Sequence, residues 1–88
     1  MTDEELIQAE IETDPYHPGP ADVRLRRSGV PVWAIIGYYQ DVARGDPSVV
    51  ERDYDISARE VEAALAYYRR YKDAIDARLA TNRLTPVG

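Results

Sequence analysis

Helix start and stop signals follow one another closely in the middle of this sequence, and they leave few choices of fold. Pro31 can occupy a first helical turn, and Gly45 can end the same helix. Asp46 and Pro47 form a cap followed by a first-turn proline, which begins a short helix over the eight residues PSVVERDY. The apolar positions expected to face inward are Val32, Ile35, Ile36, Tyr39, Val42, Ala43, Val49, Val50 and Tyr54. The spacing predicts two successive amphipathic helices.

A third and longer helix is predicted from Ser57 to about Asn82. Ser57 and Glu60 have the spacing of a capping box, in which each side chain bonds the other residue's backbone N–H. One apolar stripe continues along the whole segment, at Val61, Ala64, Leu65, Tyr68, Ile75 and Leu79. Residues 32–82 are therefore expected to form a three-helix unit in a mainly α fold with a long C-terminal helix. Residues 83–88 lack periodicity and are expected to form a tail.

The N-terminal third carries weaker signals. Apolar residues at helical spacing predict either a short helix over residues 2–12 or a frayed terminus. The segment DPYHPGP holds three prolines, which favours an extended linker, so residues 1–20 are expected to be a helix followed by a linker. Residues 21–32 alternate polar and apolar side chains around the break RRSG, a pattern typical of a short β arm or hairpin.

Length and composition limit what the chain can do. Its 88 residues suffice for one hydrophobic core, so residues 1–88 are expected to form a single domain. The absence of cysteine excludes disulfides and thiolate chemistry and suits the reducing cytoplasm. A formal charge of −5 disfavours nonspecific binding to phosphate backbones and favours a basic partner. The longest apolar run, Val30 to Tyr39, is far shorter than the roughly 18 residues of a membrane span, so no membrane partner is expected.

The unequal lengths of the predicted helices indicate a binding surface. At about 1.5 Å per residue the last helix would span roughly 36 Å and the helix after Pro31 only about 20 Å, so the last helix should overhang. Ile75 and Leu79 on the overhang need cover, either from the N-terminal segment or from a second protein. Tyr67, Tyr71 and Arg78 form a second stripe of residue types that often anchor protein interfaces. Alternatively, these tyrosines flank the core with their hydroxyls in water.

Basic residues offer further candidate contacts. Arg24, Arg26 and Arg27 on the β arm have no obvious acidic neighbours, so they are candidates for contact with nucleic acid or with an acidic groove on a protein. The succession of a short helix, a turn and a long helix also has the outline of a DNA-binding unit. The residues that would enter a major groove, near Arg59 and Glu62, lie among acidic side chains that phosphates would repel.

Catalysis has little support in the sequence. His17 is the only histidine and there is no cysteine to complete a metal set or a catalytic triad with it. The carboxylates lie mostly at helix starts, where they complement the helix dipole. We therefore expect a protein that is not an enzyme and that uses no cofactor and no metal.

Three segments carry a resemblance to a known family: SGVPVWAIIGYY, GDPSVVERDYDIS and EVEAALAYYRRYKDAIDARLATN. They resemble the domain-of-unknown-function family numbered 433 (DUF433), and DEELIQAEI and DPYHPGPADVRL resemble the N-terminal region of a subgroup of that family. The resemblance implies a homeodomain-like, helix-turn-helix-like helical domain preceded by a short β arm. The arm of many relatives holds an arginine that is missing from Ser28, Gly29, Val30 and Pro31, so any role of that arginine does not carry over.

The resemblance also implies a function. It indicates an antitoxin of a bacterial type II toxin–antitoxin system that binds a PIN-like ribonuclease toxin, as a homodimer or in a hetero-oligomer, with operator DNA as an additional partner. Toxins of that class hold a divalent metal with clustered carboxylates, and antitoxins of comparable pairs often block such a site with a tail or an arginine. The last helix and tail are therefore expected to bind and occlude the toxin through Tyr67, Tyr71, Ile75, Arg78, Leu79 and Arg83.

Within that set Arg83 is the expected blocker. It is expected to follow the regular helix, from where its guanidinium can bind a carboxylate cluster with a bidentate fork. Two other interpretations stay open: a helix-turn-helix-type DNA-binding transcriptional regulator, and a homodimeric structural module whose long helices pair with each other.

Overall fold

The computed structural model describes residues 1–84, with side chains described up to residue 82. The helices are α1 (Asp3–Glu10), α2 (Val32–Asp41), α3 (Pro47–Tyr54), α4 (Ala58–Arg70) and α5 (Lys72–Leu84), with a 3-10 turn, η1 (Pro20–Asp22). Two short strands, β1 (Ile11–Glu12) and β2 (Arg24–Leu25), pair antiparallel. The described part is thus mainly helical with a small two-stranded sheet, which confirms the predicted class.

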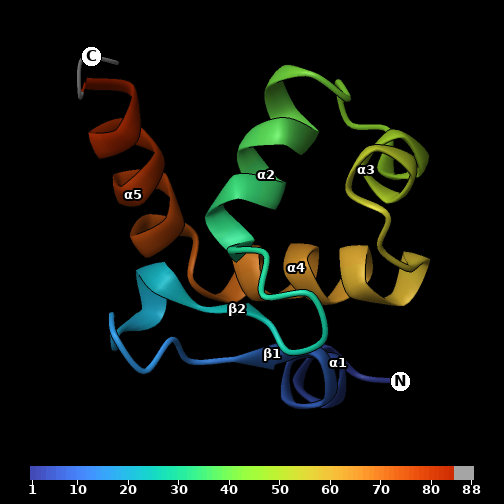
Figure 1. Ribbon diagram of the computed structural model, residues 1–88, viewed down its shortest axis with the longest axis horizontal. Helices are drawn as coiled ribbons and strands as arrows, with labels where there is room; N and C mark the ends of the chain where they lie inside the picture. Colours follow the sequence, from blue (N-terminus) through green and yellow to red (C-terminus); the bar gives the residue numbers. More distant parts are fainter. Residues whose placement is uncertain (85–88) are drawn as a thin grey trace.

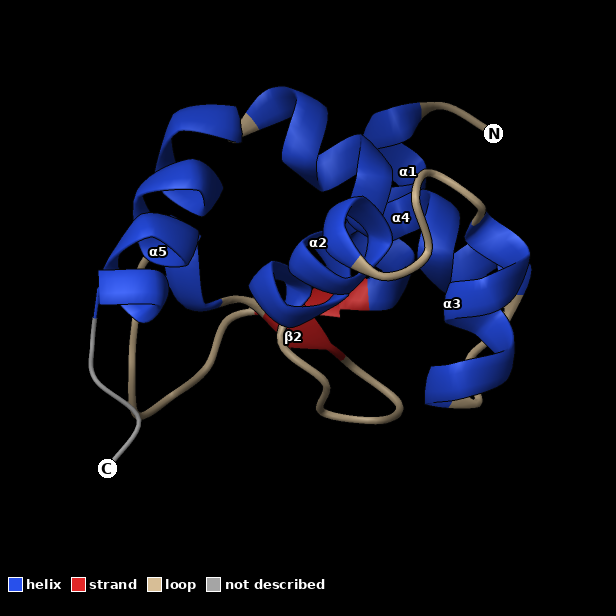
Figure 2. Cartoon of the chain, turned by 90° about the horizontal axis from the view of Figure 1, so that it is seen from above, coloured by secondary structure: helices blue, strands red, loops and turns tan. Residues whose placement is uncertain are grey.

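Helix α4 runs through the middle of the molecule (Figure 1). Helices α5, α2 and α3 lie on one side of it, while α1 and the two strands lie on the other. Seen from above, α2 lies between α5 and α3 (Figure 2). Each of the other α-helices packs against α4 or α2, which is how a short chain without disulfides closes one core.

The predicted helix starts are confirmed. The Asp46 carboxylate accepts a 3.0 Å hydrogen bond from the backbone N–H of Ser48, and Pro47 begins α3. Ser57 and Glu60 form the predicted capping box, with bonds of 3.0 and 3.1 Å. Helix α1 begins with a second capping box, between Thr2 and Glu5, so the frayed-terminus alternative is wrong.

Helix α2 ends earlier than predicted. Val42 takes the C-cap position, and the backbone N–H groups of both Val42 and Ala43 bond to the carbonyl of Tyr38. This wider turn directs Ala43 into the core and leaves Val42 55% exposed, so the prediction that Val42 faces inward is wrong. Gly45, with a φ of 84°, supplies the left-handed backbone that completes the turn.

The N-terminal helix is shorter than predicted, because its last two residues belong to β1. Ile11 lies opposite Leu25 in the sheet, and both side chains enter the core. The predicted β arm is confirmed at its centre, since Leu25 N–H donates to the Val30 carbonyl at 2.9 Å and Arg24 forms a bridge with Pro31. Strand β2 therefore lies between β1 and the start of α2.

The predicted long C-terminal helix is wrong, because the chain breaks at Tyr71 into α4 and α5. Tyr71 has non-helical angles, φ −120° and ψ 41°. Helix α5 turns to pack against α2 and η1, which buries Ile75 completely and leaves Leu79 only 6% exposed. A Cβ on Gly37 of α2 would lie 3.0 Å from Leu79 Cδ2, so the glycine permits this close approach. The predicted overhang therefore does not form, and Ile75 and Leu79 are covered within the chain.

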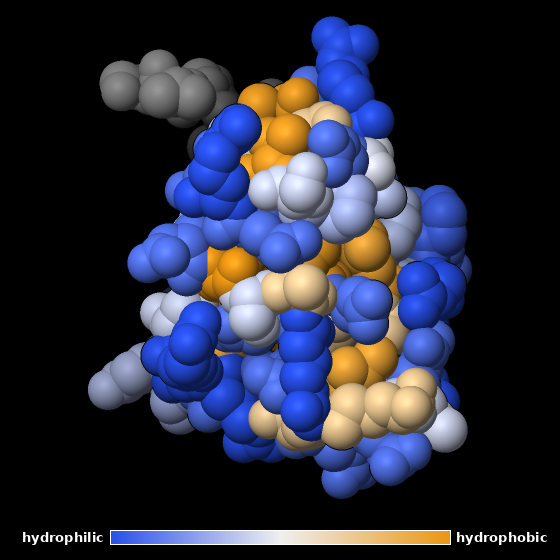
Figure 3. All heavy atoms as spheres, turned by 90° about the vertical axis from the view of Figure 1, so that its right-hand side faces the viewer, coloured by the Kyte–Doolittle hydropathy of each residue, from blue (hydrophilic) through white to orange (hydrophobic). Residues whose placement is uncertain are grey.

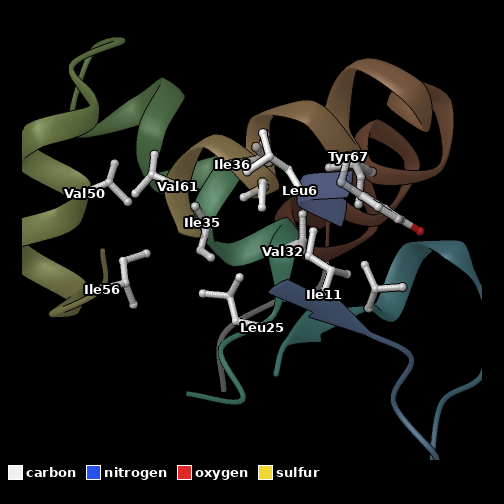
Figure 4. Packing of buried hydrophobic residues seen from close by; sticks show 14 of the residues in the cluster. Leu6, Ile11, Leu25, Val32, Ile35, Ile36, Val50, Ile56, Val61 and Tyr67 are labelled. Carbon is white, nitrogen blue, oxygen red and sulfur yellow. The ribbon is translucent and has the colours of Figure 1, made fainter. Parts of the chain in front are cut away.

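The core joins all of these elements (Figure 4). Its fully buried side chains include Leu25, Val32, Ile35, Ile36, Val50, Val61 and Ile75. Burying each such side chain is worth about 1.5–3 kcal/mol, so this cluster is the main source of stability. Tyr67 was predicted on the second stripe but is 5% exposed, whereas Tyr68, predicted in the core, is only partly buried. The two assignments are reversed because α1 and the following segment pack on the side of α4 that carries Tyr67.

Candidate protein-binding groove

An open groove of about 600 Å³ lies between α1 and β1 on one side and the end of α4 on the other. We call it the tyrosine groove. Its apolar lining includes Ile7, Ile11, Pro20, Val23, Tyr67 and Tyr71, and its polar lining includes Gln8, Glu12 and Arg26. A concave apolar surface with a few polar groups at its rim is the usual form of a binding site.

Two tyrosines from the end of α4 form one wall of the tyrosine groove. Residues four apart on a helix lie on the same side, and the rings of Tyr67 and Tyr71 stack with their centroids 4.6 Å apart. The hydroxyl of Tyr67 donates a 2.6 Å hydrogen bond to the carbonyl of Pro20, and burial raises its pKa to about 12. Tyr71 lies at the break between the helices and stays 40% exposed. Tyr67 is thus a fixed support for an exposed aromatic ring.

Arg26 and Glu12 form the polar rim. The Arg26 guanidinium donates to the carbonyl of Gln8 at 3.3 Å and lies 3.9 Å from a Glu12 carboxylate oxygen. The other Glu12 oxygen accepts a 2.7 Å hydrogen bond from Arg24, which raises the pKa of that guanidinium. Arg24 and Arg26 therefore both have an acidic partner, Glu12, which corrects the expectation that they lack acidic neighbours.

Arg27 faces a different part of the molecule. Its guanidinium donates to Glu60 Oε1 at 2.7 Å, and Glu60 is only 2% exposed. The Arg27 side chain is itself 69% exposed, so it bridges solvent and a buried carboxylate. Arg27 thus compensates a charge inside the fold, so it too has an acidic neighbour that the sequence did not reveal.

The rest of the predicted toxin-binding set is divided. Ile75 and Leu79 belong to the core, and only Tyr67 and Tyr71 line the groove. Arg78 lies elsewhere: it donates to Asp22 at 3.2 Å, and its guanidinium carbon lies 4.6 Å from the centre of the Trp33 ring.

The position of Arg83 also differs from the expectation. Residue 83 lies inside α5, not beyond the regular helix, and its side chain is outside the described residues. The expected tail, residues 83–88, was placed too early, because residues 83 and 84 still belong to α5; residues 85–88 lie outside the described residues.

The residues that the sequence did not reveal come from the N-terminal segment. Ile7 and Gln8 on α1 and Glu12 on β1 form the wall opposite the tyrosines. Ile7 is one of the apolar residues whose helical spacing predicted the N-terminal helix. No local signal showed that α1 docks on α4 beside Tyr67, because that contact joins residues some 60 positions apart in the sequence.

The remaining polar candidates have structural partners. His17 Nδ1 lies 3.5 Å from an Asp14 carboxylate oxygen. The pKa of Asp14 is lowered, mainly by a hydrogen bond from the Tyr16 backbone N–H, so the pair belongs to a tight turn. Arg59 lies 3.2 Å from Glu10 of α1. Within the described residues no group of three or more histidine, cysteine, aspartate or glutamate side chains is arranged to hold a metal ion.

A search against protein-family models, curated protein sequences and solved structures found no significant match. In residues 1–84, no helix is both long and apolar enough to cross a membrane.

Proposed function

We propose that this protein is a protein-binding inhibitor, the antitoxin of a bacterial toxin–antitoxin pair, and that its tyrosine groove receives part of a PIN-like ribonuclease toxin. The observation that carries the proposal is Tyr71, a 40% exposed ring stacked on the buried, hydrogen-bonded Tyr67 in the wall of an open groove. An aromatic ring that is held in place before binding loses little conformational entropy in the complex. Arg26 at the rim adds a donor for the partner's carbonyl or carboxylate groups.

Charge and sequence support the same proposal. The formal charge of −5 favours a basic partner, as a nucleic-acid-binding toxin would be. The resemblance to the family numbered 433 leads us to assign helices α2, α3 and α4 as its homeodomain-like unit. In this proposal the protein acts in the cytoplasm, without enzymatic activity of its own, in a hetero-oligomer with the toxin.

Helix α5 extends the proposed contact toward the toxin's active site. Arg83 follows Tyr71 by about 18 Å along α5, at 1.5 Å per residue. A single toxin domain spans that length, so it can occupy the groove and also meet the end of α5. Arg83 would then bind the toxin's carboxylate cluster. If Arg83→Ala leaves toxin inhibition and complex affinity unchanged, the blocking role belongs to another residue.

A DNA-binding function has one specific observation in its favour. Helices α3 and α4 are joined by only residues 55–57, the spacing of a helix-turn-helix unit. Against it, Arg59 is paired with Glu10, and the exposed Glu62 has no ion pair in the described part. Phosphate binding would therefore meet an unfavourable surface. A salt-sensitive shift of promoter DNA by the isolated protein would establish this second function.

Co-expression with the protein encoded by the adjacent gene tests the proposal. We expect the adjacent protein alone to arrest growth, and we expect this chain to restore growth and to co-purify with it. A soluble chain that neither co-purifies nor restores growth would exclude the antitoxin function for this pair. A homodimer found in its place by sedimentation would favour the structural-module alternative.

A further inference from the structure

A second groove, of about 430 Å³, lies between α1, α3 and α4. We call it the acidic groove. Leu6 and Leu65 contribute its apolar lining, and Glu51 and Glu62 stand on α3 and α4. Three carboxylates, those of Asp3, Glu51 and Glu62, line it against one guanidinium, that of Arg69. The side of the molecule formed by α3 and the start of α4 carries apolar patches between hydrophilic side chains (Figure 3).

The carboxylates of Glu51 and Glu62 have no ion pair or hydrogen bond within residues 1–82. The reason is local as well as tertiary. Four residues after Glu51 on α3 comes Asp55, a like charge, and the residues four before and after Glu62 on α4 are both alanine. Arg59, three residues before Glu62, is the helical neighbour that could reach it, but its guanidinium lies 3.2 Å from Glu10 instead.

The arginines of α4 are held by a different set of carboxylates. Arg69 bonds Asp3 at 3.0 Å, Arg70 bonds Glu4 at 2.7 Å, and Arg59 lies 3.2 Å from Glu10. All three of these acidic residues lie on α1, and the order of the pairs shows that α1 runs antiparallel to α4. Because α1 takes these three cations, none of them pairs with Glu51 or Glu62 in the described part of the chain.

We propose that the acidic groove is a docking surface for a cationic amphipathic helix of a partner protein. Lysine or arginine side chains of that helix pair with Glu51 and Glu62, while its apolar face covers Leu65 and the 71% exposed side chain of Met1. A helix is favoured over an extended segment because α1, α3 and α4, with Met1 just before α1, line the groove. No strand lines it to which an added strand could pair. This inference is independent of the tyrosine groove and of the toxin.

Titration of the isotopically labelled full chain with a synthetic peptide tests the proposal. The probe is a 14-residue helix of leucine and lysine with its leucines on one face. Binding is monitored by changes in NMR chemical shifts and by a binding isotherm. We expect shifts confined to residues that line the acidic groove. We also expect the Glu62→Gln variant to bind about two- to fivefold more weakly, as loss of one exposed ion pair implies, and the double variant Glu51→Gln/Glu62→Gln more weakly still.

The matched control is Asp73→Asn, which removes the same charge from an exposed side chain of α5 outside the groove. Equal weakening by Glu62→Gln and Asp73→Asn would show attraction to net charge alone and would overturn the proposal. So would equal binding of a peptide with glutamine in place of lysine, or shifts centred on Tyr71. A homodimer of the free chain that Glu62→Gln dissociates would assign the groove to a second copy instead.

Discussion

The hydroxyl of Tyr67 donates a 2.6 Å hydrogen bond to the backbone carbonyl of Pro20, 47 residues earlier in the chain. This bond ties the proline-rich linker to the last turns of α4 and closes one end of the tyrosine groove. In Figure 4 the hydroxyl points away from the apolar cluster. Because Tyr71 stacks on the same ring, its position depends on this bond as well.

Removing that hydroxyl should lower the free energy of unfolding. Tyr67→Phe leaves the Pro20 carbonyl without its donor, which costs about 0.5–1.5 kcal/mol. Urea unfolding followed by circular dichroism measures the loss. Tyr16→Phe is the matched control, because Tyr16 is 84% exposed and should show no change. Equal stability of the two variants would mean that water replaces the bond without cost.

The same residue predicts how stability depends on alkaline pH. Burial raises the pKa of Tyr67 from 10.0 in the unfolded chain to about 12 in the folded protein. A group whose folded pKa is raised contributes stability that is complete below pH 10 and is lost between pH 10 and pH 12. The free energy of unfolding, measured across that pH range, should decline as the pH rises. The decline should be smaller in the Tyr67→Phe variant. Tyr38 and Tyr54, whose pKa values are also raised, account for the part that remains.

The ion pair between Arg27 and Glu60 should contribute more to the free energy of unfolding than the exposure of Arg27 suggests. Glu60 is 2% exposed, and among residues 1–82 its Oε2 has no hydrogen-bond partner and Arg27 is the only cation bonded to it, so Arg27→Ala leaves a buried carboxylate without its cation. We expect a loss of about 1–3 kcal/mol in the free energy of unfolding. Arg52→Ala provides the comparison, because Arg52 is equally exposed but pairs with its exposed neighbour Asp53. That variant should lose clearly less stability than Arg27→Ala, because an exposed ion pair is screened by solvent.

The close approach of α2 and α5 can be tested at Gly37. Alanine there would place its Cβ 3.0 Å from Leu79 Cδ2, which offsets the roughly 1 kcal/mol that alanine gains over glycine in a helix. Leu79→Val removes the δ carbons. Gly37→Ala should therefore be more favourable in the Leu79→Val protein than in the natural one, with a coupling of at least about 0.5 kcal/mol in a double-mutant cycle. Additive effects would contradict the contact between the two residues.

Much of the helical part of the fold follows from local chemistry. Asp46, and Ser57 with Glu60, mark helix starts because their side chains accept hydrogen bonds from backbone N–H groups at the start of the helix. Pro47 fits the first turn because it has no N–H that would need a partner. The break at Tyr71 has no such signal. It forms because turning α5 buries Ile75 and Leu79 against α2 and η1, and this burial outweighs the backbone hydrogen bonds lost at the break.

The candidate site was only partly predictable for the same reason. Tyr67 and Tyr71 could be placed together, since their spacing of four residues fixes them on one side of a helix. Their opposite wall, with Ile7 and Glu12, depends on the docking of α1 and on the pairing of β1 with β2. The arginines of the β arm were misjudged because Glu12 and Glu60 reach them only in the folded chain.

The most direct test of the tyrosine groove is the dissociation constant of the complex with the adjacent gene's product, measured for Tyr71→Ala and for Tyr16→Ala. Both variants remove an exposed tyrosine ring, but only Tyr71 lies in the groove. We predict that Tyr71→Ala weakens the complex about tenfold or more, as truncation of a central aromatic anchor does, and that Tyr16→Ala leaves it unchanged. Equal affinities for the two variants, with both proteins folded, would contradict the groove as the toxin-binding surface.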